Sequence, residues 1–223
     1  MGEAIGQVLP LAVGVAISPM PIVAAVLMLV SPRARGNGPA FIVGWVLGLA
    51  AVGAIMLLIA DPAGASEDDA PATWVSWLKI VLGALLLLVA LGEWRGRPKG
   101  AEQPAAPKWM AAIADFTPVK AAGAGVLLSA LNPKNLLLAV AAATAIAATG
   151  IPGGEQAVAY AIFTLIGTIG VAAPVFIFFA LDDRAPRLLG SLRAWMEHSN
   201  AVIMAVLLLV IGAKLIGDGL AGL

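Results

Sequence analysis

The sequence contains no cysteine and few charged residues. Without cysteine, the chain has no disulfide, no thiolate metal site and no thiol redox chemistry. Only 12% of its residues are charged and 61% are hydrophobic, whereas a soluble domain is about a quarter charged and about half apolar. This composition predicts an all-α polytopic membrane protein and leaves no room for a separate soluble domain.

The groups that enzymes use for chemistry are also scarce inside the apolar segments. Ser18 has no histidine or carboxylate at its depth, so a hydrolase site is not expected. No Asp, Glu or His lies deep enough for a metal site, and His198 stands alone at a segment boundary. No Gly-rich phosphate loop is followed by Lys and Ser or Thr. We expect no enzymatic activity, no metal, no cofactor and no nucleic-acid partner.

Six apolar runs are long enough to cross a bilayer, which takes about 20 residues. The longest linker, at 94–120, separates the third run from the fourth and is rich in Pro, Gly and basic residues. We therefore expect a first three-helix unit at 1–93, a basic cytoplasmic linker with an amphipathic segment at 94–120, and a second three-helix unit at 121–223. The six runs are Val8–Val30, Pro39–Ala60, Trp74–Leu91, Ala121–Ala148, Gln156–Leu181 and Asn200–Ile216.

Basic residues gather in alternate loops. The second and fourth loops and the N-terminus carry no Lys or Arg, and the second loop is acidic, with Glu67, Asp68 and Asp69. Cytoplasmic loops concentrate Lys and Arg, so we expect the odd-numbered loops in the cytoplasm and both termini outside the plasma (inner) membrane. The basic loop residues are Arg33 and Arg35 in the first loop, Arg95, Arg97, Lys99, Lys108 and Lys120 in the third, and Arg184, Arg187 and Arg193 in the fifth.

The two halves of the chain repeat the same order of features. Phe41–Gly48 is similar to Tyr160–Gly167, with an aromatic start and a glycine seven places later, and Leu87–Gly92 is similar to Leu207–Gly212. Both pairs lie about 120 positions apart. Because each half has three spans, the second half must enter the membrane from the opposite side. The sequence predicts two inverted three-helix repeats, an architecture of many secondary transporters.

Proline interrupts the first and fourth runs near their middle. The interruptions are Ser18–Pro21 and Leu131–Asn135. Proline lacks an N–H group and clashes with the preceding turn, so each run is expected to contain a discontinuous helix. Such breaks persist only inside protein or beside a water-filled cavity, because an unpaired carbonyl in hydrocarbon costs several kcal/mol. Paired broken helices point to the binding site of a transporter.

Lys134 is the one ionisable residue that cannot be placed near a surface, since Lys79 and Lys214 lie towards span ends and can extend to the interface. A charge at mid-bilayer costs about 2.5–3.5 kcal/mol even on a lenient scale. Without a carboxylate at its depth, Lys134 would be held by carbonyls freed at the prolines or by a substrate anion. Two interpretations stay open: the cluster contacts substrate, or it only joins two broken helices.

Other polar residues complete the predicted substrate site. Asn132 and Asn135 can donate and accept hydrogen bonds, and Ser18 either caps a half-helix or contacts the ligand. Thr164 and Thr168 lie one turn apart on the fifth span, where threonine commonly bonds its own backbone. The candidate substrate-binding residues are Ser18, Pro19, Pro21, Asn132, Pro133, Lys134, Asn135, Thr164 and Thr168.

Two basic loop segments have the apolar spacing of amphipathic helices. In Lys108–Phe116 the apolar face includes Trp109 and Phe116, and in Arg187–Met196 it includes Leu189 and Trp195. Each segment is expected either to lie in the headgroup plane or to cover the helix bundle.

These motifs resemble a known group of transporters. Leu131–Lys134 resembles the Asn-Pro-Lys signature of the lysine-exporter superfamily of small six-span carriers. Together with Ile17–Ile22 and Leu29–Arg35, it is closer to the glycopeptidolipid- and sulfolipid-addressing proteins of mycobacteria and related actinobacteria. The resemblance covers essentially the whole chain. It implies export or surface delivery of an envelope lipid alongside a larger lipid transporter.

Alternatives to lipid export remain open. Exporters of amino acids and other small metabolites carry the same Asn-Pro-Lys motif, and a non-transporting scaffold of a larger lipid-export complex is a competitor from a different class. A carrier requires Lys134, whereas a scaffold requires the basic loops. The expected partners are membrane lipids, a glycolipid or other anionic small-molecule substrate, a larger lipid transporter and a second copy of the chain in a homodimer.

Overall fold

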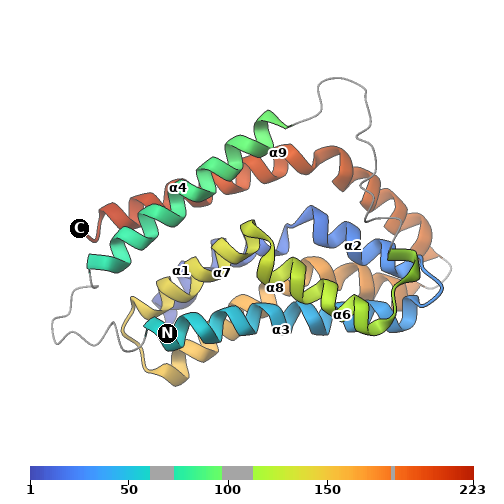
Figure 1. Cartoon of the computed structure of the whole chain (residues 1–223), viewed down its shortest axis with the longest axis horizontal. Helices are drawn as coiled ribbons and strands as arrows, with labels where there is room; N and C mark the ends of the chain where they lie inside the picture. Colours follow the sequence, from blue (N-terminus) through green and yellow to red (C-terminus); the bar gives the residue numbers. More distant parts are fainter. Residues whose placement is uncertain (61–72, 97–112, 182–183) are drawn as a thin grey trace.

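The computed structural model describes residues 1–60, 73–96, 113–181 and 184–223 (Figure 1), and every element in these ranges is helical. The predicted acidic turn at 61–72 and most of the basic linker lie outside the described residues, as do Lys108–Met110 of the first amphipathic segment and the side chain of His198. The elements are α1 (Gly2–Ala16), α2 (Pro19–Leu29), α3 (Ala34–Ala60), α4 (Thr73–Arg95), η1 (Ile113–Asp115), α6 (Pro118–Val126), η2 (Leu127–Leu131), α7 (Pro133–Ala147), α8 (Gly153–Leu181) and α9 (Ala185–Leu220).

The described chain has four helices that are long and apolar enough to cross a membrane, or six such spans if each bent helix pair is counted as one. The two bent pairs are Gly2–Ala16 with Pro19–Leu29, at 50°, and Pro118–Leu131 with Pro133–Ala147, at 63°. Both bends fall at the proline interruptions that the sequence predicts. The described part of the chain is therefore that of an all-helical membrane protein with four to six candidate spans.

Several predicted span ends are wrong. Pro39 lies inside α3, which begins at Ala34, and α4 continues past Leu91 to Arg95. The amphipathic segment at 187–196 and the sixth span form one continuous helix, α9. Hydropathy alone makes the spans too short at these ends, because a helix continues into polar sequence wherever its backbone hydrogen bonds and packing persist.

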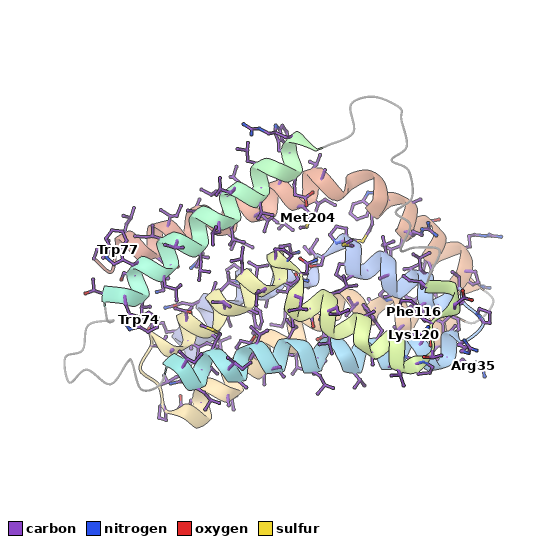
Figure 2. All side chains as sticks on the ribbon, in the orientation of Figure 1. Arg35, Trp74, Trp77, Phe116, Lys120 and Met204 are labelled. Atoms are coloured by element: carbon purple, nitrogen blue, oxygen red, sulfur yellow. The ribbon has the colours of Figure 1, made fainter. Side chains whose placement is uncertain are left out.

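The described helices form a body and a pair that packs against it through the first turns of α9. In Figure 1, α4 and α9 lie side by side along one edge of the molecule. In the body, α3 packs on α6 and α7, and α8 packs on α1 and α2. Both termini lie at the end of the molecule that carries Trp74 and Trp77, and Arg35 and Lys120 lie at the other end (Figures 1 and 2).

Glycines bring the helices into backbone contact at three crossings. A Cβ built on Gly44 of α3 would lie 1.9 Å from the carbonyl oxygen of Ala122, and one built on Gly170 of α8 would lie 1.8 Å from that of Ala16. Between α4 and α9 the contact is reciprocal, because a Cβ on Gly83 would lie 2.7 Å from the oxygen of Gly212. Small residues at helix crossings allow this close approach in membranes.

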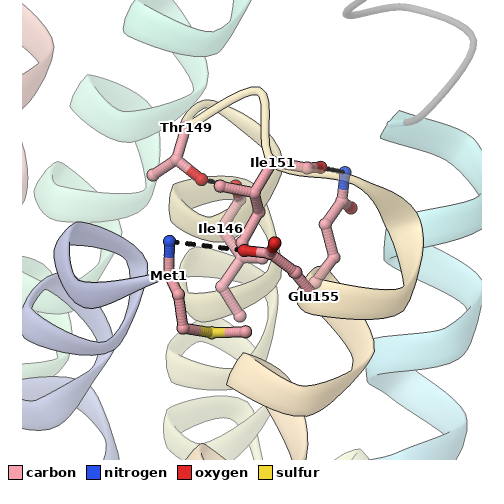
Figure 3. Close-up of polar contacts among 6 residues, drawn as sticks. Met1, Ile146, Thr149, Ile151 and Glu155 are labelled. Atoms are coloured by element: carbon pink, nitrogen blue, oxygen red, sulfur yellow. Dashed lines mark hydrogen bonds and ion pairs between the residues drawn. The ribbon is translucent and has the colours of Figure 1, made fainter.

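Polar contacts close the end of the body that carries the N-terminus (Figure 3). The amino group of Met1 lies 3.5 Å from a carboxylate oxygen of Glu155, which joins the start of α1 to the start of α8. After α7, the Thr149 hydroxyl donates to the carbonyl of Ile146, and Gly150 takes a φ of 65° that favours glycine. These contacts fix the turn between α7 and α8.

Candidate functional site

The ammonium of Lys134 lies in the break of the first span. Lys134 is the second residue of α7 and is 4% exposed. Its Nζ donates to the carbonyl oxygen of Gly14 at 2.7 Å, to the hydroxyl of Ser18 at 2.6 Å and to the carbonyl oxygen of Ile17 at 3.3 Å. An ammonium has three N–H donors, so these acceptors from the α1–α2 junction match its full capacity.

Proline chemistry explains why acceptors are available there. In an α-helix each carbonyl accepts from the N–H four residues later. Pro21 has no N–H for the carbonyl of Ile17, which accepts from Lys134 instead. Pro19 likewise cannot serve the carbonyl of Val15, which lies 2.7 Å from the Ser18 hydroxyl. The first break therefore creates the acceptors, and one residue of α7 brings the cation that occupies them.

A matching arrangement occurs at the second break. The π-helix η2 ends at Leu131, and Pro133 provides no N–H to its last turn. The side-chain amide of Asn135 donates to the carbonyl of Leu128 at 2.9 Å, and its Oδ1 lies 3.0 Å from the Ser18 hydroxyl. Lys134 and Asn135 thus join the two interrupted spans through adjacent positions of one helix.

The caps of the two half-helices differ from the expectation. Ser18 stands at the N-cap of α2 but makes no side-chain cap hydrogen bond, because its hydroxyl turns back to the end of α1. Asn132 caps α7 instead, with its Oδ1 accepting from the backbone N–H of Lys134 at 3.1 Å. Asn132 therefore fixes the start of the helix that carries Lys134.

The remaining predicted residues separate into two groups. Pro19 and Pro21 are buried in the first turn of α2, and Pro133 is exposed at the start of α7. On α8, the Thr168 hydroxyl donates to the carbonyl of Thr164 at 2.7 Å, the backbone bond that threonine commonly makes in a helix. The Thr164 hydroxyl is buried and has no partner among the described residues. No hydrogen bond between described side chains links either threonine to Lys134.

Sequence reasoning missed two side chains that act on Lys134. Met204 reaches it from α9, with Sδ 3.7 Å from Nζ (Figure 2). Glu93 on α4 is the carboxylate whose charge acts on Lys134. Glu93 lies two residues beyond the end predicted for the third span, Leu91, in a helix that continues to Arg95. Met204 gave no signal, since a methionine in an apolar run is ordinary.

The described residues contain no group of three or more His, Asp or Glu side chains placed together as metal ligands. What the site offers is one cation held by two carbonyl oxygens and a hydroxyl, at the bend between α1 and α2. Such a centre binds an anion only by exchanging it for some of the oxygens now bonded to Lys134.

The family model described as Sap, sulfolipid-1-addressing protein, matches residues 8–221, which is nearly the whole chain. No curated protein and no solved structure matches the chain.

Proposed function

Because the chain belongs to the sulfolipid-1-addressing protein family, we propose that it is a transporter of the lysine-exporter superfamily that exports or delivers an anionic envelope lipid to the cell surface. The family and the apolar helices fit a membrane protein involved in lipid delivery. The observation that carries the transport role is the buried ammonium of Lys134 at the junction of two broken spans. The activity moves a lipid and makes or breaks no covalent bond.

The mechanism that we propose is an exchange of oxygen ligands. A sulfate or phosphate headgroup carries the oxygen acceptors that an ammonium prefers, and it adds a full negative charge that carbonyls lack. When such a group replaces the carbonyls of Gly14 and Ile17, α7 is no longer bonded to the end of α1. Binding of the headgroup thereby releases one of the polar contacts between the two halves and couples recognition to opening.

The mechanism that we propose also includes an inverted repeat, which two features of the packing support. The packing of α3 on α6 and α7 is the counterpart of the packing of α8 on α1 and α2. A Cβ on Gly48 would meet the hydroxyl of Ser129, and one on Gly167 would meet Val15. Ser129 lies four positions before Pro133, and Val15 lies four positions before Pro19. The two glycine crossings therefore involve equivalent positions of the first and fourth predicted spans. The other predicted match is weaker, because Gly92 is open whereas Gly212 lies against α4.

The distribution of basic residues supplies the orientation. Arg35 and Lys120 lie at one end of the molecule and both termini at the other (Figures 1 and 2). Since cytoplasmic loops concentrate Lys and Arg, we place Arg35 and Lys120 at the cytoplasmic face of the plasma membrane. Both termini are then extracytoplasmic, and a lipid that leaves the cytoplasmic leaflet moves away from the basic end.

A non-transporting scaffold is the second candidate, and a specific observation favours it. The three donors of Lys134 already have protein acceptors, as expected of a residue that only joins helices. In that case an anionic lipid has no access to the ammonium, and the exposed Arg33, Arg35 and Lys120 would mediate contact with a larger lipid exporter.

Flux in liposomes separates the two candidates. We expect Lys134→Gln to lower the flux of a sulfated glycolipid by about tenfold or more, because a hydrogen bond to a charged group is lost. Ser18→Ala is the matched control, since it weakens the same junction but keeps the charge, and its flux should stay within about threefold. Comparison with amino acids as cargo identifies the substrate class.

The scaffold makes the opposite prediction. If flux or surface delivery is unchanged in Lys134→Gln but lost in Arg35→Gln, the carrier role of Lys134 is wrong. Each variant is compared at equal amounts of folded protein, so that loss of stability is not mistaken for loss of transport.

A further inference from the structure

The ammonium of Lys134 has more neighbours than it has protons to give them. Two contacts are short, to the hydroxyl of Ser18 at 2.6 Å and to the carbonyl oxygen of Gly14 at 2.7 Å. Two are longer, to the carbonyl oxygen of Ile17 at 3.3 Å and to the sulfur of Met204 at 3.7 Å. Since an ammonium has three N–H groups, the two longer contacts share one proton, and a thioether is a weak acceptor. The ammonium is therefore held least firmly on the side of Met204.

Met204 belongs to a buried face of α9 that is turned toward the body (Figure 2). Intervals of four, three and four positions place the buried residues of this face one above another on the helix. Val206 and Leu209, which are exposed, lie on the opposite face. The buried face consists of Met204, Leu208, Ile211 and Leu215. With this apolar face, α9 covers the junction at Lys134.

Farther along the same face, α9 reaches a residue that holds Lys134. The Cδ1 atom of Ile211 lies 2.6 Å from a Cβ built on Gly14, so a glycine is needed there to admit the isoleucine side chain. Like the sulfur of Met204, this atom lies toward the end of a side chain. Both contacts can be relieved by a change of rotamer, without a shift of either backbone. Toward α9, the junction is therefore closed by side chains that can move.

Toward α8, by contrast, the junction is closed by backbone. A Cβ built on Gly170 of α8 would lie 1.8 Å from the carbonyl oxygen of Ala16 at the end of α1. Two backbones in such contact separate when a whole helix moves, because no change of rotamer relieves the contact. An anion therefore reaches Lys134 with less rearrangement from the side of α9 than from the side of α8.

Close packing joins α9 to α4. A Cβ on Gly212 would lie 2.9 Å from the carbonyl oxygen of Gly83, and the hydroxyl of Ser76 donates to the carbonyl of Gly222 at 3.0 Å. A wider opening at Lys134 would therefore move the two helices together. The path to the ammonium lies between the α4–α9 pair and the body, and not between α4 and α9.

We propose that Met204 marks the entry side of the Lys134 site: the sulfate or phosphate headgroup of an anionic lipid approaches between α9 and the body, and its first oxygen takes the place of the Met204 sulfur. This inference rests on the proposed lipid transport and adds the side from which the ligand arrives. The carbonyl of Ile17, which shares a proton with the sulfur, is exchanged next. Gly14 and Ser18 hold the ammonium until the headgroup is bound.

A lipid suits this path better than a water-soluble anion. The body and the α4–α9 pair consist of apolar helices that qualify as membrane spans, so the space between them opens to the bilayer. The acyl chains of a lipid stay in hydrocarbon while its headgroup reaches the ammonium. A free anion would have to cross the hydrocarbon without a partner for its charge. The ligand of this entry side is therefore an anionic amphiphile.

Binding to the purified full chain in neutral detergent tests the entry side, with sulfated galactosylceramide and the same lipid without sulfate as probes. Met204→Gln places a full oxygen acceptor beside Lys134 in a side chain of similar length, and it should weaken binding of the sulfated lipid by about tenfold or more. Met204→Leu removes the sulfur acceptor with little change of volume, and it should tighten binding by up to about fivefold. Val206→Gln, on the exposed face of α9, is the control and should bind as the wild type does.

The two Met204 variants are expected to differ in sign. A general loss of packing at α9 would weaken binding in both, and equal binding in both would mean that the headgroup does not pass the position of the sulfur. Each of these results would overturn the proposal. Displacement of the lipid by inorganic sulfate at an equal concentration would also overturn it, because the ligand would then be a free anion.

Photolabelling gives a readout that a purely structural role of Met204 would not change. The probe is sulfated galactosylceramide with a diazirine on the first carbons of its acyl chain, and specific labelling is the part that excess unmodified lipid removes. We expect specific labelling of α9 between Met204 and Leu208, and we expect its loss in Lys134→Gln. Specific labelling confined to α3 or α8 would place the entry elsewhere and refute the proposal.

Flux measured on the same variants separates this inference from the carrier itself. Specific labelling at Met204 in a protein without flux would retain the entry side and refute the carrier. Flux that requires Lys134 but is the same in Met204→Gln and Met204→Leu would retain the carrier and refute the entry side.

Discussion

At the scale of single residues, the hydroxyl of Ser18 is the shared point of the junction. It accepts from Lys134 and has two acceptors within reach, the carbonyl of Val15 at 2.7 Å and Oδ1 of Asn135 at 3.0 Å. A hydroxyl has one proton, so it donates to one of the two at a time. Removal of this oxygen affects the first span, the second break and the ammonium together.

We therefore predict that Ser18→Ala lowers the free energy of unfolding by about 1–3 kcal/mol, because buried partners are left unsatisfied. The measurement is the apparent melting temperature in neutral detergent. Ser191→Ala is the control: the Ser191 hydroxyl is exposed and bonds only the carbonyl of Arg187. Its effect should remain within about 0.5 kcal/mol. Equal losses in both variants would contradict the role of Ser18.

The sequence predicts which residues form this junction better than it predicts which atoms they bond. Proline chemistry predicts freed carbonyls and Lys134 as their donor, and the structure pairs Ile17 and Gly14 with it. It does not predict Glu93 or Met204, because α4 and α9 reach Lys134 only through tertiary packing. The carbonyl of Gly14 gave no signal, because the residue four positions later is Ser18 and not a proline.

At the scale of helices, glycines set the distance between broken and unbroken spans. Gly44 of α3 meets the carbonyl of Ala122 on α6, and Gly170 of α8 meets the carbonyl of Ala16 on α1. Each contact joins a continuous helix to a half-helix beside a break. Because the facing atoms are backbone, an added methyl group cannot be relieved by a change of rotamer.

Gly44→Ala and Gly170→Ala should each destabilise the protein, by about 1–3 kcal/mol for an overpacked contact. Gly123→Ala on α6 should be neutral or stabilising by up to about 1 kcal/mol, since its Cβ would meet no atom within 4 Å and alanine favours the helix. The melting temperature should thus fall in Gly44→Ala and Gly170→Ala and should stay the same or rise in Gly123→Ala. A loss of stability in Gly123→Ala equal to that in Gly44→Ala would mean that the crossings are not the cause.

The helices themselves were largely predictable, whereas their ends were not. Hydropathy places the spans, and Pro19 and Pro133 locate both breaks. Hydropathy misplaces the start of the second span at Pro39, which is exposed and lies inside α3, five residues after its first residue, Ala34. No hydropathy signal separates a membrane span from an amphipathic helix joined to it, so the continuity of α9 was missed.

At the scale of the whole molecule, the two ends differ in chemistry. Arg35 and Lys120 occupy one end, and Trp74, Trp77 and both termini the other (Figures 1 and 2). The helices run alternately between these ends, which fits three spans in each half entering from opposite sides. The sequence predicts this polarity from loop charges, although it cannot place α4 and α9 as a separate pair.

Single cysteine variants test the orientation without background, because the chain has no cysteine of its own. In intact cells, a membrane-impermeant maleimide should label Gly154→Cys and should label Arg35→Cys only after permeabilisation. Both positions are exposed, so reagent access to the protein surface is matched. Labelling of Arg35→Cys in intact cells would reverse the orientation and, with it, the proposed direction of transport.

The unbroken length of α9 has a consequence for the membrane itself. Only Ala201–Leu220 of its 36 residues is an apolar span, and these 20 residues extend about 30 Å, which matches a hydrocarbon layer of about 30 Å. Its first turns are held against α2 and α8 through Ala185 and Leu189, so the helix cannot slide along its axis to match a thinner or thicker bilayer. The lipids must adjust to the protein instead, and hydrophobic mismatch at α9 would retain the chain in membranes of matching thickness.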